Sequence, residues 1–187
     1  MKQEMKIACL GWGSLVWRPE FLLIYRQWFN DGPILPIEFA RQSNDGRLTL
    51  VIMPSAKPVR SLWALMTTND IEQAKNSLMI REGIAKENQD RLIGAVNVSV
   101  RLEEPNELVI QNWAKLLALD WVIWTNLAPR FNGENKAPSP EEATEYLRGL
   151  DTKRRGIAEE YIRRTPRQID TEYRRRFEHE FGWTYID

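Results

Sequence analysis

The sequence predicts an α+β fold, with strands concentrated in the first half of a chain of 187 residues and helices in its last third. Short apolar runs separated by turn residues fill the first half, and each has the length of a strand. After residue 69 the apolar spacing changes to that of helices, and the last third carries capping signals. Because strands and helices are segregated and do not alternate, α+β is favoured over α/β.

The predicted strands are bounded by turn residues. They cover residues 6–10, 35–41, 47–53, 59–67 and 92–102. The stretch "SNDGR" separates the second from the third and contains Asp-Gly, which supplies the positive φ of a tight turn. We therefore expect a hairpin there.

The first predicted helix has a start signal, an apolar face and a stop signal. Asn69 and Glu72 have the spacing of a capping box, Ile71 and Leu78 belong to the apolar face, and Gly83 is suited to the C-terminal end. A second helix is expected over residues 107–118. The stretch "WVIWTNL" that follows has strand character.

The C-terminal third is expected to be helical after a loop, "RFNGENKAPSP". Ser139-Pro140 with Glu142 opens one capped helix, and a further helix covers residues 152–164. Thr165-Pro166 with Gln168 is expected to open the last. We treat residues 138–187 as a helical extension packed on a single domain that spans residues 1–187.

Composition indicates an ordinary globular protein. Hydrophobic residues make up 43%, and 26 basic residues balance 26 acidic ones, so net charge steers the chain toward neither nucleic acid nor membrane. Cys9 is the single cysteine, which excludes an intrachain disulfide and a thiolate-rich metal site. We see no targeting signal or apolar span, and expect a cytoplasmic protein.

A glycine-rich turn follows the first predicted strand in "CLGWGSLVWRPEF". Gly11 and Gly13 would let backbone N–H groups point at a carboxylate or oxyanion. A dinucleotide fingerprint would need glycine at Val16, and neither a phosphate-binding P-loop nor a nucleophile elbow is present. Ser14 as a triad nucleophile would need His179, the only histidine, which lies between glutamates. The alternative is a structural turn whose glycines avoid a clash.

Glu82 is the candidate catalytic residue. It follows Leu78 by four positions and so lies on the face of the first helix expected to turn toward the sheet. Burial and the negative end of the helix dipole both favour a carboxyl group that can carry a proton near neutrality. The alternative is a glutamate at a frayed helix end that is hydrated or paired with Arg81, Lys86 or Arg91.

Two segments resemble one family. "GWGSLVWRPEF" is similar to the opening motif of the ChaC-type branch of the gamma-glutamylcyclotransferase-like superfamily, with matches at Gly11, Gly13, Ser14, Leu15, Trp17, Pro19 and Phe21. "SLWALMTTNDIEQAKNSLMIREGI" resembles the family's strand and helix, and places Arg81 and Glu82 on its Arg-Glu pair. The resemblance implies a small, mostly antiparallel twisted β-barrel with flanking helices.

The resemblance also implies an activity, the release of 5-oxoproline from a small gamma-glutamyl amine or peptide such as glutathione, without cofactor or metal. Such transferase or lyase chemistry would use Glu82 as general acid and base. Substrate would bind at Gly11, Trp12, Gly13, Ser14 and Leu15, and the cavity would include Trp17, Arg81 and Asn126. Trp12 stands where the family usually has tyrosine, which removes a hydroxyl group. Asn126 has an alternative role as a residue that ends a strand.

Two other functions remain open. The chain could be a non-catalytic member of the same fold that binds an amino-acid-like ligand. The C-terminal arginines could instead form a surface for nucleic acid or for an acidic partner. Acidic residues interrupt that row at helix-surface spacing, so we expect self-paired arginines and no nucleic-acid partner. The arginines are Arg154, Arg155, Arg163, Arg164, Arg167, Arg174, Arg175 and Arg176.

Overall fold

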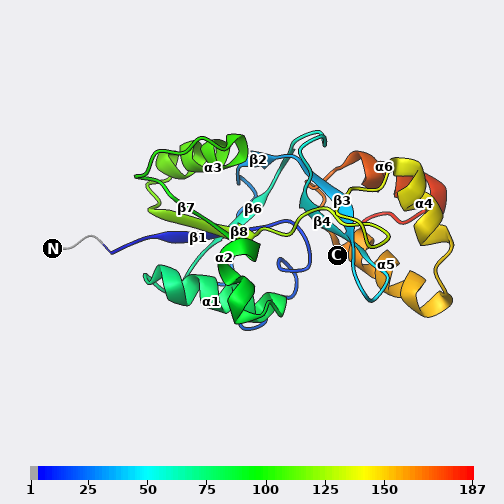
Figure 1. Ribbon diagram of the computed structural model, residues 1–187, viewed down its shortest axis with the longest axis horizontal. Coiled ribbons are helices and arrows are strands. Elements are labelled where there is room, and N and C mark those ends of the chain that lie inside the picture. The colour runs from blue at the N-terminus through cyan, green and yellow to red at the C-terminus, as the bar shows by residue number, and fades with distance from the viewer. Residues whose placement is uncertain (1–3) are drawn as a thin grey trace. The chain divides into compact units, whose positions relative to one another are not determined.

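The computed structural model describes residues 4–187, which form two compact units that interleave along the chain. Unit 1 contains residues 4–11, Arg18–Leu35 and Arg60–Asn126. Unit 2 contains Trp12–Trp17, Pro36–Val59 and Leu127–Asp187. Most of their helices and strands are labelled in Figure 1. Each unit has its own buried core, and the expectation of one domain stays a prediction.

The sheet of unit 1 has four strands in the order β6-β1-β8-β7. The two inner strands, β1 (Ile7–Gly11) and β8 (Trp121–Thr125), are parallel. The outer strands, β6 (Leu62–Leu65) and β7 (Ile93–Asn97), are antiparallel to their neighbours. The expected barrel is therefore wrong for the described residues, because the strand order is linear and the two outer strands do not pair. The α+β class is confirmed.

Helices cover both faces of this sheet. Figure 1 shows α1 (Ile71–Glu82) and α2 (Gln89–Leu92) on one side of the strands and α3 (Pro105–Leu116) on the other. A 3₁₀ turn, η1 (Lys86–Asn88), precedes α2. The cap of α1 is Asp70, one residue later than expected, because its carboxylate accepts from the first-turn amides. Gly83, with φ of 64°, ends α1 as predicted.

Unit 2 is built on a hairpin of β3 (Ile37–Gln42) and β4 (Leu48–Ile52). The turn between them contains Gly46 with φ of 95°, which confirms the hairpin expected from Asp-Gly. Two-residue strands, β2 (Ile34–Leu35) and β5 (Val59–Arg60), lie where the chain passes from one unit to the other.

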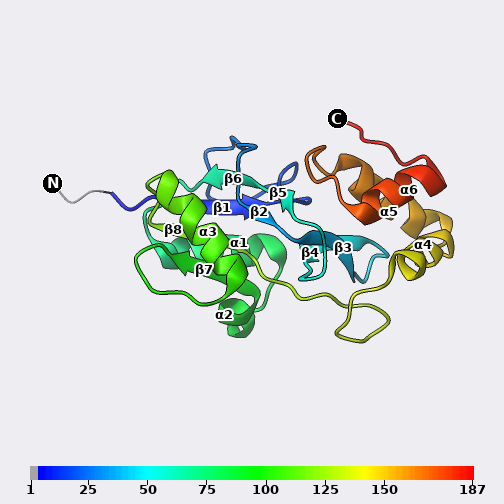
Figure 2. The ribbon, with the colours of Figure 1, turned by 90° about the horizontal axis from the view of Figure 1, so that it is seen from above.

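Three helices complete unit 2, and Figure 2 shows them gathered at one end of the hairpin. They are α4 (Pro140–Arg148), α5 (Thr152–Arg164) and α6 (Glu172–Phe181). The capping box that opens α4 is confirmed. Phe177 of α6 packs edge-on against Phe39 of β3, with ring centroids 5.8 Å apart. This contact places the helices on the hairpin.

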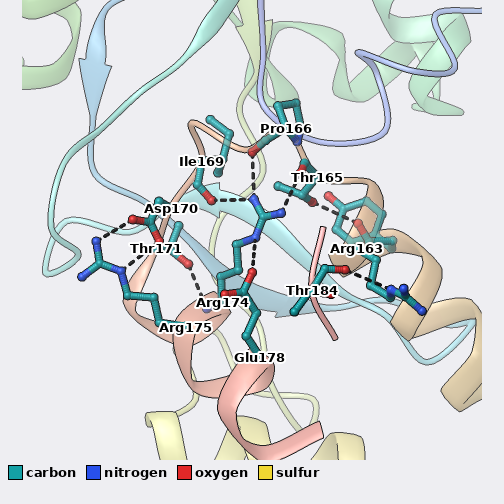
Figure 3. Close-up of polar contacts among 11 residues, drawn as sticks. Arg163, Thr165, Pro166, Ile169, Asp170, Thr171, Arg174, Arg175, Glu178 and Thr184 are labelled. Carbon is teal, nitrogen blue, oxygen red and sulfur yellow. Dashed lines mark hydrogen bonds and ion pairs between the residues drawn. The ribbon is translucent and has the colours of Figure 1, made fainter. Parts of the chain in front are cut away.

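The last helix begins at Thr171 as its cap, so the predicted start at Thr165 is wrong. The guanidinium of Arg174 donates to the backbone carbonyl groups of Thr165, Pro166 and Ile169 at 2.8–3.1 Å (Figure 3). Arg174 is 3% exposed. These hydrogen bonds hold the segment before α6 in turns around the buried guanidinium. The backbone carbonyl groups of that segment therefore have hydrogen-bond donors without forming a helix.

Candidate functional site

Glu82 is the last residue of α1, and most of its side chain is shielded from solvent. The side chain is 18% exposed, and Oε1 lies 2.7 Å from Nη1 of Arg81. The left-handed Gly83 ends the helix directly afterwards, so the carboxylate lies at the negative end of the helix dipole. The ion pair compensates this unfavourable position and orients the carboxyl group, and it is the pairing with Arg81 that the alternative interpretation of Glu82 predicted.

Arg81 connects this carboxylate to the rest of unit 1. Its Nε and Nη2 donate to the backbone carbonyl of Arg18 at 3.0 and 2.7 Å, while Nη1 faces Glu82. The Arg81 side chain is 10% exposed. A planar guanidinium that binds a carbonyl and a carboxylate at once is a rigid support for both.

Cys9 of β1 locates the Glu82 carboxylate relative to the sheet. Burial raises the pKa of the Cys9 thiol well above its usual range, and the negative charge of Glu82 raises it further while Arg81 lowers it. The carboxylate is therefore close to the face of β1 that carries Cys9. Gly11 lies two residues further on the same face, at the end of the strand. In unit 1 the ion pair of Glu82 and Arg81 thus lies close enough to Cys9 to act on it, and Gly11 ends the same strand.

The segment Trp12–Trp17 belongs to unit 2, where it forms a tight turn. The backbone N–H of Val16 donates to the carbonyl of Gly13 at 3.0 Å. Trp12 is 6% exposed, and its indole N–H donates to the carbonyl of Leu50 at 3.1 Å. Leu15 is buried, whereas Ser14 and Trp17 are half-buried. The indole at position 12 therefore has a structural partner.

Gly13 is required by a close approach of Tyr161 from α5. A Cβ at position 13 would lie 2.4 Å from the tyrosine hydroxyl oxygen, closer than atoms can pack. That hydroxyl accepts from the backbone N–H of Leu50 at 3.2 Å, and the ring lies 5.6 Å from that of Trp17. This contact supports the alternative interpretation of the turn for Gly13, namely that the glycine is present to avoid a steric clash. Sequence reasoning did not single out Tyr161, whose only signal is its helical spacing with Ala158.

Two other predicted residues have simple surroundings. Asn126 is exposed directly after β8, and its backbone N–H donates to the carbonyl of Leu92 at 2.8 Å, as expected of a residue that ends a strand. His179 is 86% exposed and its Nδ1 lies 3.6 Å from the Glu180 carboxylate. Residues 4–187 contain no cluster of three or more His, Cys, Asp or Glu side chains suited to a metal ion.

A second buried carboxylate, Glu38 of β3, was not predicted. It is 2% exposed, and its oxygens accept from the backbone N–H groups of Phe39 at 2.9 Å and Tyr173 at 3.2 Å. Burial raises the pKa of Glu38 to about 7, although the Thr171 hydroxyl and the two N–H groups lower it. Tyr173 lies in the first turn of α6, so Glu38 caps that helix from a neighbouring strand. Its environment therefore indicates a structural role.

The expected self-pairing of the C-terminal arginines is confirmed at several positions. Arg163 and Arg164 pair with acids four residues earlier, and Arg174 pairs with Glu178. Arg175 pairs with Asp170 within the same loop and helix (Figure 3). These guanidinium groups are consequently neutralised within unit 2.

No helix within residues 4–187 has both the length and the apolar character needed to cross a membrane. No protein-family model, curated protein or solved structure matches this chain. The chemistry of the candidate site must therefore be argued from its own residues.

Proposed function

We propose that the protein is a gamma-glutamylcyclotransferase-like enzyme that releases 5-oxoproline from a small gamma-glutamyl amine or peptide, with Glu82 as general acid and base. One observation carries the proposal. The Glu82 carboxylate is largely shielded from water, yet it is held in a fixed orientation near the β1 face that ends at Gly11. A shielded, oriented carboxylate suits proton transfer better than a hydrated one.

The first step uses Glu82 as a base. The substrate carries an α-ammonium group, which cannot attack until it loses a proton. Glu82 accepts that proton, and the freed amine attacks the γ-carbonyl carbon, forming the new C–N bond of the five-membered ring. The contact with Arg81 holds the carboxyl group in place, so the proton acceptor needs little rearrangement.

The second step uses the same residue as an acid. The carbon–nitrogen bond to the departing amine breaks, and Glu82 returns its proton to that nitrogen. The ring nitrogen still carries a second hydrogen, and this proton passes through the regenerated carboxylate to the departing amine. The products are therefore 5-oxoproline and the protonated amine, and the carboxylate of Glu82 is free again. Protons balance within the two steps, so this chemistry requires no cofactor.

Of the proposed substrate-binding residues, Gly11 belongs to unit 1, the same unit as Glu82. Having no Cβ, it lets a ligand approach the backbone at the end of β1. The motif resemblance also assigns Trp12, Gly13, Ser14 and Leu15 to substrate binding, and their contribution stays a prediction. The cavity-lining roles of Trp17 and Asn126 also stay predictions.

One observation favours the alternative, a non-catalytic protein that binds an amino-acid-like ligand. Trp12 replaces a tyrosine hydroxyl, and its own N–H donates to Leu50 within the fold. If the family's hydroxyl is needed for turnover, this substitution would leave binding without catalysis.

Turnover by the purified chain tests the proposal. A panel of gamma-glutamyl amines and peptides is incubated with the wild type, and 5-oxoproline is measured by mass spectrometry. Glu82→Gln retains the size of the side chain and removes proton transfer. Glu72→Gln, at the other end of the same helix, is the matched control because Glu72 is exposed and pairs with Lys75.

We expect turnover of at least one panel member by the wild type and the control, and a rate at least about 100-fold lower for Glu82→Gln. Absence of turnover over the whole panel would overturn the enzyme proposal. In that case, saturable binding of a panel member by calorimetry would support the binding alternative. Full activity of Glu82→Gln would remove Glu82 from the mechanism.

A further inference from the structure

Unit 2 contains a pocket that the proposed chemistry does not use. Its volume is about 240 Å³, and it is lined by the turn of the β3–β4 hairpin, by the segment before α4 and by helices α4 and α5. The lining side chains and glycines are Gln42, Ser43, Asn44, Gly46, Arg130, Gly133, Tyr146 and Arg154. They include two arginines and no acid.

Two tight turns contribute to the pocket lining. Gly46 has φ of 95° in the hairpin turn, and Gly133 has φ of 80° in a two-residue turn closed by hydrogen bonds between Phe131 and Glu134. A Cβ at Gly46 would lie 2.8 Å from the Cβ of Arg154. The hairpin turn and the base of Arg154 are thus packed together, which fixes where this side chain emerges.

Arg130 is positioned by backbone pairing. Its N–H donates to the carbonyl of Ala40 at 3.1 Å, and its carbonyl accepts from Gln42 at 2.8 Å, which aligns it in parallel with Arg41. Paired residues of neighbouring strands point to the same face, so two like charges lie side by side. The charge of Arg130 and partial burial both lower the pKa of Arg41. Among residues 4–187, no acidic side chain forms an ion pair with either arginine.

The remaining lining groups are hydrogen-bonding and uncharged. Tyr146 donates to the carbonyl of Gly46 at 3.1 Å, which ties α4 to the hairpin turn. The nearby Asp45 is paired with Arg47 at 2.8 Å, and its carboxylate also accepts from Ser43. Arg154 has one acidic contact, Asp151, at 3.7 Å, beyond good hydrogen-bond distance. Positive charge in the pocket is therefore only partly compensated.

We infer that this pocket binds the phosphate or pyrophosphate group of a small molecule, with Arg130 and Arg154 as the charged contacts. The volume fits such a group and is small for a whole drug-sized ligand. Guanidinium groups bind phosphate oxygens through charge-assisted hydrogen bonds, and the side-chain amide N–H groups of Gln42 can donate to the same oxygens. An anion would also relieve the repulsion between Arg130 and Arg41.

Calorimetric titration of the full chain with sodium pyrophosphate and with inorganic phosphate, at constant ionic strength set with chloride, tests the inference. We expect a pyrophosphate dissociation constant of about 0.1–1 mM. Arg130→Gln and Arg154→Gln should each weaken binding at least about 10-fold. Arg175→Gln is the matched control, since Arg175 is an exposed arginine of unit 2 paired with Asp170, and it should bind as the wild type does.

Amide shifts measured by nuclear magnetic resonance give a second readout that does not depend on affinity alone. Pyrophosphate should shift the signals of Gly46 and Gly133, and these shifts should disappear in Arg130→Gln. No binding by the wild type up to about 10 mM would overturn the inference. Equal weakening of pyrophosphate binding in Arg175→Gln would indicate a diffuse basic surface and would also overturn the inference. The same conclusion would follow if a single-stranded oligonucleotide bound more tightly than pyrophosphate and all three variants weakened its binding.

Discussion

Two shielded carboxylates, Glu82 in unit 1 and Glu38 in unit 2, differ in their exposure and in the groups that they bind. Glu82 lies at the C-terminal end of a helix and forms an ion pair with the guanidinium of Arg81, with 18% of its side chain exposed. Glu38 is 2% exposed and accepts from the start of a helix. Burial alone does not identify a catalytic acid. A carboxylate that satisfies buried backbone N–H groups, as Glu38 does, has a structural role.

The largest expected effect concerns catalysis at Glu82. Glu82→Gln should lower the rate of 5-oxoproline release by about 100- to 10,000-fold, because the amide cannot accept or return the proton. Glu38→Gln should leave the rate within about 3-fold of wild type, since that side chain serves α6. Steady-state kinetics on the same substrate measure both. A larger loss in Glu38→Gln would reverse the comparison.

The next effect concerns folding at Glu38. Glu38→Ala leaves the N–H groups of Phe39 and Tyr173 buried without their acceptor, so at pH 5 we expect the free energy of unfolding to fall by about 2–4 kcal/mol. Urea denaturation followed by tryptophan fluorescence measures this change. A loss below about 0.5 kcal/mol would show that water replaces the carboxylate and that it does not cap α6.

The pH dependence of stability gives a third test. Because burial raises the pKa of Glu38 from 4.5 to about 7, the folded chain binds a proton at this site where the unfolded chain has lost it. This stabilisation is complete below pH 4.5 and is lost as pH rises to 7, a contribution of about 3 kcal/mol. Urea denaturation at several pH values should show this decline in the wild type. Glu38→Gln should have a flatter profile, and identical profiles would contradict the assignment.

The smallest expected effect is on folding at Glu82. Glu82→Gln retains an oxygen acceptor for Arg81, and Arg81 still binds the carbonyl of Arg18, so we expect stability to change by less than about 1 kcal/mol. Thermal and urea denaturation beside the wild type check this. A loss of several kcal/mol would make Glu82 a structural residue and would undermine any activity loss as evidence for its chemistry.

Local signals predicted much of the fold. The Asp-Gly dipeptide determined the β3–β4 turn, and Ser139 with Glu142 determined the start of α4, because both depend on residues within a few positions. The start of α6 was missed because Arg174 binds the carbonyl groups of the preceding segment, including that of Thr165. The sheet's open form was missed because strand closure depends on partners distant in sequence.

The candidate site likewise divides into features that local sequence predicted and features that depend on distant segments. The helical spacing placed Glu82 on the sheet-facing side of α1 and Gly83 at its end, since side-chain direction along a helix follows from its period. The contact of Gly13 with Tyr161 joins residues 148 positions apart, and nothing local signals it. Likewise, the pairing of Arg41 with Arg130 depends on which segment lies beside β3.

The sequence by itself determined the α+β class, the hairpin turn, the end of α1, the start of α4 and the bounds of α5, because caps, turns and periodicity act over a few residues. Only the tertiary structure decided that Glu38 is a buried cap, that Gly13 must have no side chain, and that Arg130, which forms no ion pair with an acid among residues 4–187, borders a pocket together with Arg154. The physical reason is that burial and charge compensation depend on contacts between segments that are far apart in the sequence. Such contacts produce no periodic pattern in the sequence that could reveal them.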